Sequence, residues 1–450
     1  MRDEEKILAR AEEIEDQILS LLQRLVRIPS RTGEEGEAQE FLAKYLKNLG
    51  LKVDLWEPDL EKMFRRFPDH AQYPSHWQHD LVLPYTERPT YRDFVKSGKG
   101  SVLNYRDRPN LISRVGADRG GRSLILNGHI DTVTVEPREE WTRDPFGGEI
   151  VKGKLYGRGA SDMKAGIVAA VGAIQAIREA GVRLNGTVIF ESVVNEEHAG
   201  NGTLASIAEG ISAKGAIVMG PSGGNVYTGN PGGLYWEIRI RGNSSSPGAR
   251  WNGDKQVGVS AIEKLPPLIQ EFMDLERRQR NRKGDENRFS MVIGKVGGGT
   301  YETATASDCR LRGVVYFGPD RRGLPEVRDM LRRSIGRAIK GDRWLEKCPP
   351  DLLFLHEGDP SRQERNHPLV SLMADTVFKV TGVKPVVEDA PFACDMRHLK
   401  NQGKVPTIVY GPGSIHQAHR PDEYVPIKEM LPSVKALALT VYRWCNRRKR

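Results

Sequence analysis

Apolar and polar positions follow one another with a period that changes along the chain, and these changes divide it into predicted elements. Residues 1–26 place apolar side chains at helical spacing, which predicts an amphipathic helix. From Asn110 onward, short apolar runs of strand character alternate with longer segments of helical spacing, such as residues 163–181. This alternation predicts a sheet covered by helices, which is the α/β class.

A second pattern interrupts the first. Between residues 232 and 361 the expected order is strand, helix, strand, strand, helix, strand, which suits a small open-faced α+β unit of the type β-α-β-β-α-β. We therefore predict a catalytic domain formed by residues 1–231 plus 362–450, with residues 232–361 inserted as a second domain. Residues 57–105 have no clean period and are predicted to be mostly loop.

The composition agrees with a two-domain globular protein. The chain has 450 residues, of which 38% are hydrophobic and 28% charged. The longest apolar stretches fall far short of the roughly 20 residues that a membrane span needs. The N-terminal segment has no apolar signal-peptide core, and the four cysteines are scattered without a CxxC pair, as suits reduced thiols. We expect a cytoplasmic protein that has no membrane partner.

The net charge of +9 raises the question of a nucleic-acid partner. The basic residues are spread along the chain, and the dense clusters, such as residues 276–283 and those from Arg447 onward, lie at the ends of predicted elements. Because no nucleic-acid-binding motif accompanies them, a solvated surface is the better interpretation. An anionic substrate is a milder interpretation of the same charge.

The first candidate functional residues follow a predicted strand, in the segment GHIDTV. His129 and Asp131 are two residues apart, so their side chains point to the same side of an extended chain. A carboxylate placed there can hold the second ring N–H of a metal-binding histidine and fix its tautomer. Taken alone, a pair of this kind is more often structural than functional.

Two further segments place carboxylates beside predicted strands or helices. In GRGASDMKAG a glycine-rich turn brings Asp162 to the start of a helix, where it can cap the helix or bridge two cations. In VNEEHAG, directly after a strand, Glu196 and Glu197 point to different sides, so one can bind a metal while the other takes a proton. A solvated acidic loop is the ordinary alternative for this pair.

A glycine-rich loop near the C-terminus, GPGSIHQAHRPDEYVP, offers His416 and His419. With the preceding motifs it completes a mixed nitrogen and oxygen ligand set, which suits zinc or another divalent ion such as cobalt or manganese. Each motif has an ordinary structural explanation by itself. Chance does not account well for all four in one β/α framework.

In this order the four motifs resemble the dinuclear zinc hydrolases of the acetylornithine deacetylase and succinyl-diaminopimelate desuccinylase type, a family that also holds aminoacylases and carboxypeptidases. The resemblance covers the chain apart from residues 57–105. It implies a mixed-sheet, zinc-exopeptidase-like catalytic domain with an inserted lid and dimerisation domain, and a homodimer formed through that lid. It also implies a cis peptide bond between Asp162 and Met163.

The resemblance implies a role for each matching residue. It makes His129 a ligand of the first metal, Asp131 the carboxylate that orients His129, and Asp162 the carboxylate that bridges both metals. It makes Glu196 the general base on the metal-bound water, and Glu197 and His419 the ligands of the second metal.

Two positions depart from the family's pattern. Gly220 stands where the family has an acidic ligand of the first metal, and Ser246 stands where it has a histidine that reaches the partner's active site and polarises the scissile carbonyl. The first metal would keep two protein ligands and the second three, so we expect the second to bind more tightly. Losing a carbonyl-polarising donor typically costs about 10²–10³ in turnover unless another group replaces it.

The sequence therefore favours a metal-dependent amidohydrolase that cleaves a linear amide bond of a small N-acyl amino acid or dipeptide-like substrate, with water activated by Glu196. One alternative is a divergent member of the family that carries out acyl transfer or another non-hydrolytic reaction. The other is a non-catalytic binding protein on the same scaffold. The retained charged residues speak against the last, because a protein without metal chemistry has no need to keep them around one site.

Overall fold

The computed structural model describes residues 2–78, 83–281, 289–319 and 323–447. The chain divides into two compact units, a larger one of residues 1–82, 90–230 and 361–450 and a smaller one of residues 83–89 and 231–360. The sequence placed residues 83–89 in the catalytic domain, whereas the structure groups them with the smaller unit. They group with the smaller unit because Tyr85 exchanges two backbone hydrogen bonds with Phe354.

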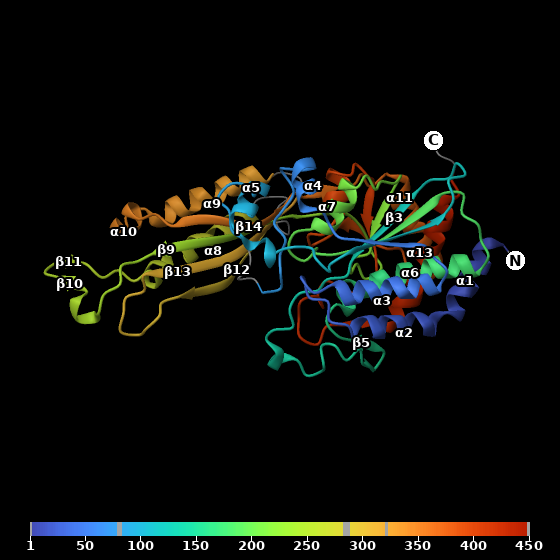
Figure 1. Cartoon of the computed structure of the whole chain (residues 1–450), viewed down its shortest axis with the longest axis horizontal. Coiled ribbons are helices and arrows are strands. Elements are labelled where there is room, and N and C mark those ends of the chain that lie inside the picture. Colours follow the sequence, from blue (N-terminus) through green and yellow to red (C-terminus); the bar gives the residue numbers. More distant parts are fainter. Residues whose placement is uncertain (1, 79–82, 282–288, 320–322, 448–450) are drawn as a thin grey trace. The chain divides into compact units, whose positions relative to one another are not determined.

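The larger unit is built on a mixed sheet with the strand order β1-β2-β6-β3-β7-β17-β8-β15, in which β16 also pairs with β8 (Figure 1). Its strands are β1 (Val53–Trp56), β2 (Asn110–Gly116), β3 (Leu124–His129), β6 (Thr187–Val193), β7 (Ala216–Val218), β8 (Val226–Asn230), β15 (Ser361–Arg362), β16 (Val387–Asp389) and β17 (Thr407–Val409). A small separate sheet contains β4 (Ile150–Val151), β5 (Lys154–Tyr156) and β18 (Tyr424–Pro426). The pairs β3–β6, β3–β7 and β7–β17 are parallel, and the predicted α/β fold is confirmed.

Helices cover both faces of this sheet, with α6 and α7 on opposite sides (Figure 1). The helices of the larger unit are α1 (Asp3–Glu13), α2 (Glu15–Val26), α3 (Gly36–Asn48), α4 (Leu60–Arg66), α5 (Tyr91–Lys96), α6 (Ala165–Glu179), α7 (Asn201–Ala208), α11 (Pro368–Thr381), α12 (Met396–Asn401) and α13 (Met430–Cys445). The single N-terminal helix expected from the sequence is instead two helices, because the backbone leaves the helical conformation at Ile14.

The central helix of this unit is α6, which packs against α1, α2 and α13 as well as the sheet. Its side chains from Ala165 to Ile177 are all buried, which explains why the sequence is apolar on every side rather than amphipathic. The segment Ala160–Glu179 is long and apolar enough to cross a membrane, yet 94% of its apolar window is buried inside the unit. It is therefore the core helix of this fold.

The segment predicted to be mostly loop holds two short helices, α4 and α5. Asp59 caps α4 by accepting a hydrogen bond from the Lys62 amide, and Thr90 caps α5 in the same way from the Asp93 amide. Helices of six or seven residues are too short to show a helical period, so the pattern of apolar residues could not predict them.

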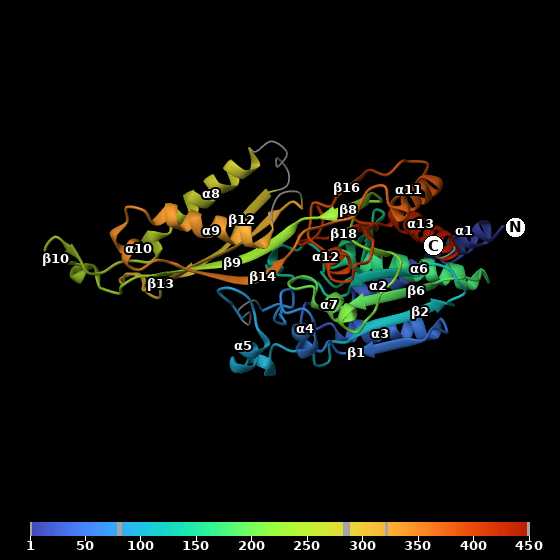
Figure 2. The same cartoon turned by 90° about the horizontal axis from the view of Figure 1, so that it is seen from above.

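The smaller unit has the predicted β-α-β-β-α-β order (Figure 2). Its main elements are β9 (Gly232–Arg241), α8 (Pro266–Arg280), β12 (Phe289–Gly298), β13 (Asp308–Phe317), α9 (Leu324–Ile339) and β14 (Asp351–Gly358), joined by the short β10 (Trp251–Asn252), β11 (Lys255–Gln256) and α10 (Arg343–Lys347). The sheet order is β12-β13-β9-β14. Pro266 begins α8, where a missing amide hydrogen is not needed, and Trp236 of β9 contacts Phe272 of α8 edge to face.

Candidate metal centre and active site

Four of the predicted site residues lie at or directly after the ends of parallel strands of the larger unit, namely His129, Asp131, Glu196 and Glu197. The strand β3 ends at His129, which pairs with Val193 at the end of β6, and Asn127 pairs with Val218 at the end of β7. Because parallel strands end at the same edge of a sheet, the loops after them converge there. This edge is where ligand sites of open α/β sheets are found.

His129 is buried, and its ring is fixed by the main chain. Its Nδ1 lies 2.9 Å from the backbone carbonyl oxygen of Asp131 and 3.7 Å from the carboxylate of the same residue. The sequence predicted that the carboxylate would hold this N–H, and that detail is wrong, since the carbonyl is the acceptor. With Nδ1 donating, Nε2 keeps its lone pair for a cation.

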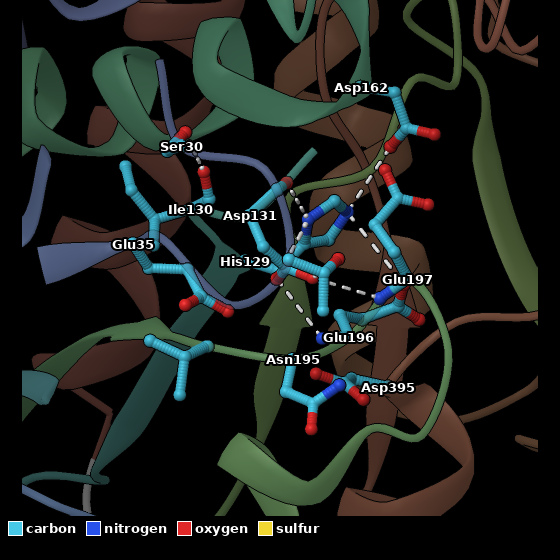
Figure 3. A network of polar contacts seen from close by, with 12 residues as sticks. Ser30, Glu35, His129, Ile130, Asp131, Asp162, Asn195, Glu196, Glu197 and Asp395 are labelled. Carbon is cyan, nitrogen blue, oxygen red and sulfur yellow. Dashed lines mark hydrogen bonds and ion pairs between the residues drawn. The ribbon is translucent and has the colours of Figure 1, made fainter. Parts of the chain in front are cut away.

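The carboxylate of Asp131 has a different task, which Figure 3 shows. It is fully buried and accepts hydrogen bonds from the backbone N–H groups of Glu196 at 3.0 Å and Glu197 at 3.2 Å. The hydroxyl of Thr32 donates a third, at 2.8 Å. Asp131 therefore fixes the turn that carries the two glutamates.

Asp162 lies between two histidines. Its Oδ1 is 3.3 Å from Nε2 of His129, and its Oδ2 is 3.6 Å from Nε2 of His419. The following peptide bond, to Met163, is cis, as predicted. Each oxygen of one carboxylate thus faces a different histidine, which is the arrangement that a carboxylate shared by two cations needs.

The buried carboxylate of Glu423 holds the turn around Asp162. It accepts hydrogen bonds from the amide of Ser161 at 2.8 Å, from the amide of Asp162 at 3.0 Å and from the guanidinium of Arg158 at 2.7 Å. Sequence reasoning missed Glu423. The one signal that could have found it is its place in the same segment as His419.

Glu197 lies close to His419 on one side and to His129 and Asp162 on the other. Its Oε2 lies 3.1 Å from Nε2 of His419, and its ligand atoms lie within 4.8 Å of those of His129 and Asp162. Donors held about 2.0–2.1 Å from one tetrahedral ion are about 3.3 Å apart. The separations of 3.1 to 3.6 Å along this chain of donors therefore fit divalent cations bound by imidazole nitrogens and carboxylate oxygens.

The charges of the cluster act on one another strongly. Burial disfavours a charged ring, yet the carboxylates of Asp162, Glu196 and Asp131 raise the pKa of His129 well above its ordinary value. His419 is half exposed, and although partial desolvation opposes its charge, the carboxylates of Glu197 and Asp162 raise its pKa to about 9. So many carboxylates in one place favour cations, whether protons or metal ions.

Glu196 is the one carboxylate of the turn that stays clear of His419. Its Oε2 is 3.9 Å from Nε2 of His129, and its Oε1 is 3.7 Å from the guanidinium of Arg397. Burial raises the pKa of Glu196 to about 8, and the nearby carboxylate of Asp395 adds to the effect. A carboxylate with a raised pKa next to a cation site can take up and release a proton near neutral pH.

The two departures from the family pattern have distinct surroundings. Residue 220 follows β7 beside His129, but a Cβ at Gly220 would lie 3.0 Å from Val409 and 3.4 Å from the ring of Phe392. Apolar side chains thus fill the space of an acidic side chain there. Ser246 is exposed in the smaller unit, at the start of a 3₁₀ turn, and His416 is exposed in the larger one.

Comparison with protein families matches residues 125–443 to the model described as peptidase family M20/M25/M40. Among curated proteins, the N-formyl-4-amino-5-aminomethyl-2-methylpyrimidine deformylase of Halalkalibacterium halodurans is 27% identical over 468 residues, covering 99% of this chain and 98% of the relative.

Two solved structures show the same fold. A di-peptidase from Saccharomyces cerevisiae superposes with a TM-score of 0.76 at 13% identity, covering 100% of both chains. A dinuclear metal binding peptidase of the M20 family from Bacillus subtilis superposes with a TM-score of 0.56 at 15% identity, covering 96% of this chain and 99% of that one. At these identities the likeness concerns the fold alone.

Proposed function

The chain belongs to peptidase family M20/M25/M40, whose members are hydrolases of amide bonds, and on this premise we propose that it is a metal-dependent amidohydrolase with Glu196 as general base. The narrower relationship to acetylornithine deacetylase and succinyl-diaminopimelate desuccinylase stays a prediction. So does the identity of the metal, for which zinc, cobalt and manganese suit the donor set.

One observation carries the proposal, namely the position of Asp162 between two histidines. Its two oxygens face His129 and His419, with Glu197 beside the latter, and this supports two cations that share one carboxylate. Divalent ions bound there would supply Lewis acidity toward an amide carbonyl and toward water. Because Gly220 adds no carboxylate on the side of His129, we propose that the cation beside His419 is held more tightly.

Glu196 supplies the proton chemistry of the proposed reaction. Its backbone N–H donates a hydrogen bond to Asp131, and its carboxylate lies between the side chains of His129 and Arg397. It can take a proton from the attacking water and pass it to the amide nitrogen as the C–N bond breaks. Water is consumed, and a carboxylic acid and an amine are formed.

The substrate class is proposed from a relative that matches nearly the whole chain. Its name describes a deformylase acting on a formylated aminomethylpyrimidine. We propose a small N-acyl amine or N-acyl amino acid with a short acyl group, a formamide included. Dipeptides are the alternative, because the fold also occurs in a di-peptidase.

A direct assay separates these classes. The protein is loaded with zinc, cobalt or manganese and offered N-formyl amines, N-acetyl amino acids and dipeptides, and the released amine is measured with and without a chelator. The proposal expects amine release that chelation abolishes and metal restores. Release that persists after complete removal of metal would refute metal dependence, and the absence of hydrolysis across all three classes would refute the proposed reaction.

A further inference from the structure

Residues 57–105, which precede the part of the chain matched by the family model, contact the turn that carries Glu196. The contacts run through Asn195, the residue directly before it. Asn195 is fully buried and has a φ of +61°, in the left-handed region that residues other than glycine rarely adopt. A backbone held in this region needs surrounding contacts that hold it there.

Residues of this segment supply the contacts that fix the Asn195 side chain. The hydroxyl of Tyr105 donates to Asn195 Oδ1 at 2.8 Å, and Asn195 Nδ2 donates to Ser75 Oγ at 2.6 Å. The backbone N–H of Ser75 donates to the same Oδ1 at 3.4 Å. Tyr105 also accepts a hydrogen bond from Asn201 Nδ2, at 2.7 Å, at the other end of the loop.

The same segment also binds the loop that carries Thr32, which contacts Asp131. The backbone N–H of Trp77 donates to the carbonyl of Thr32 at 2.7 Å, and Thr32 in turn donates its hydroxyl to Asp131. Asp131 binds the amides of Glu196 and its neighbour. Two lines of hydrogen bonds therefore run from residues 57–105 to the turn that carries Glu196, one through Asn195 and one through Thr32.

We propose that Tyr105 is a positioning residue for Glu196, acting through Asn195, and that this segment sets the geometry of the general base. The inference rests on the proposed function only for its effect on catalysis. That Tyr105 fixes the turn follows from its hydrogen bond to Asn195, whatever reaction the protein catalyses. Small displacements of a catalytic group can reduce turnover by about 10²-fold, and removing the Tyr105 hydroxyl leaves Ser75 in place, so we expect a kcat loss of about tenfold for Tyr105→Phe.

The chain offers a matched control for this variant. Tyr73 lies in the same segment and is as buried as Tyr105, with 4% of each side chain exposed. Its hydroxyl also both donates and accepts, but it does so with the backbone of Thr90. Tyr73→Phe therefore removes an equivalent hydroxyl from the same segment without touching the Asn195 contacts.

The experiment measures kcat, KM and metal content of the metal-loaded full chain for Tyr105→Phe and Tyr73→Phe, each alone and in an Asn195→Gly background. Glycine accepts the left-handed conformation, so the background keeps the turn while removing the amide through which Tyr105 acts. We expect Tyr105→Phe to lower kcat about tenfold with KM and metal content unchanged, and to have no further effect in Asn195→Gly. Tyr73→Phe should leave kcat unchanged. An equal loss from Tyr105→Phe in both backgrounds, or from both tyrosine variants, would overturn the proposal.

A second measurement does not depend on activity. Hydrogen exchange of the amides of Glu196 and Glu197, which donate to Asp131, is compared among wild type, Tyr105→Phe and Tyr73→Phe. Faster exchange in Tyr105→Phe alone supports the proposal even if wild type hydrolyses none of the substrates, an outcome that would refute only the proposed function. Unchanged exchange in Tyr105→Phe would overturn the inference while leaving the proposed function intact.

Discussion

Replacing Gly220 by glutamate tests how this chain differs from the family pattern. Continued two residues beyond the paired positions, the parallel register of β3 and β7 brings residue 220 level with His129. The family pattern has an acidic ligand at this position, so Gly220→Glu restores a carboxylate next to the proposed first site. The same substitution must displace buried atoms, because its Cβ would lie 3.0 Å from Val409 and 3.4 Å from Phe392. Gly220→Glu should therefore increase the affinity for metal and, at the same time, lower the stability of the metal-free protein.

The magnitudes follow from these contacts. Inserting atoms into a packed core typically costs about 1–3 kcal/mol, so the metal-free Gly220→Glu variant should unfold that much more easily than wild type. Binding an additional ion at 100 times its Kd would return about 2.7 kcal/mol, which nearly offsets the loss. Gly220→Ala is the control, since it adds the same Cβ contact with Val409 without a ligand.

The assay is chemical denaturation with and without zinc, combined with a metal titration. We expect Gly220→Glu to bind a second equivalent of metal more tightly than wild type and to regain stability with zinc, whereas Gly220→Ala should lose stability and regain none beyond the wild-type response. If Gly220→Glu binds metal no better than Gly220→Ala, residue 220 does not face the metal centre. The assignment of the first site would then be wrong.

Three further predictions concern other parts of the molecule. Removing one ligand by His419→Ala should abolish the tightly held metal equivalent, and His129→Ala should affect mainly the weaker one; equal losses in a chelator titration would contradict this order. Burial raises the pKa of Glu191 to about 7 from an ordinary 4.5. Between these two values the carboxyl of Glu191 is protonated in the folded state and ionised in the unfolded state. The free energy of unfolding should therefore fall by about 3 kcal/mol between pH 5 and 8. Denaturation at both pH values should show this fall in wild type and a smaller one in Glu191→Gln; equal falls would refute it. Finally, β12 is an edge strand of the smaller unit with exposed Val292 and Val296, so we predict that two chains form a homodimer along this edge. The mass in solution should be that of a dimer for wild type and of a monomer for Val296→Lys. A wild-type monomer at micromolar concentration would refute the prediction.

Much of the fold followed from periodicity, because its long elements carry a clear pattern. The core helix α6 lies within residues 163–181, where helical spacing placed it, and the smaller unit has the expected order of strands and helices. The short helices α4 and α5 did not, since fewer than two turns after a cap at Asp59 or Thr90 leave no period to recognise. The break at Ile14 likewise has no glycine or proline to announce it.

The candidate site was predictable as a set of residues but not as a set of contacts. The motifs placed His129 and Glu197 at strand ends and Asp162 at the start of a helix, and the fold brings their ligand atoms within 4.8 Å of one another. Spacing could not decide whether the carbonyl or the carboxylate of Asp131 would hold the imidazole, because both lie within reach of Nδ1. The supporting role of Thr32, almost 100 residues from Asp131, depends on tertiary contacts that no local pattern records.

The central claim is that Glu196 is the general base of a metal-dependent amide hydrolysis. The measurement that tests it most directly is the turnover and metal content of Glu196→Gln on whichever amide wild type hydrolyses, with Glu197→Gln as the adjacent control. Glutamine keeps the shape of Glu196 but cannot accept a proton, and base catalysis is typically worth about 10²–10⁴ in rate. We predict that Glu196→Gln keeps the wild-type metal content and loses at least about 10²-fold in kcat, whereas Glu197→Gln loses metal. A Glu196→Gln variant that binds metal normally and keeps most of its turnover would contradict the account.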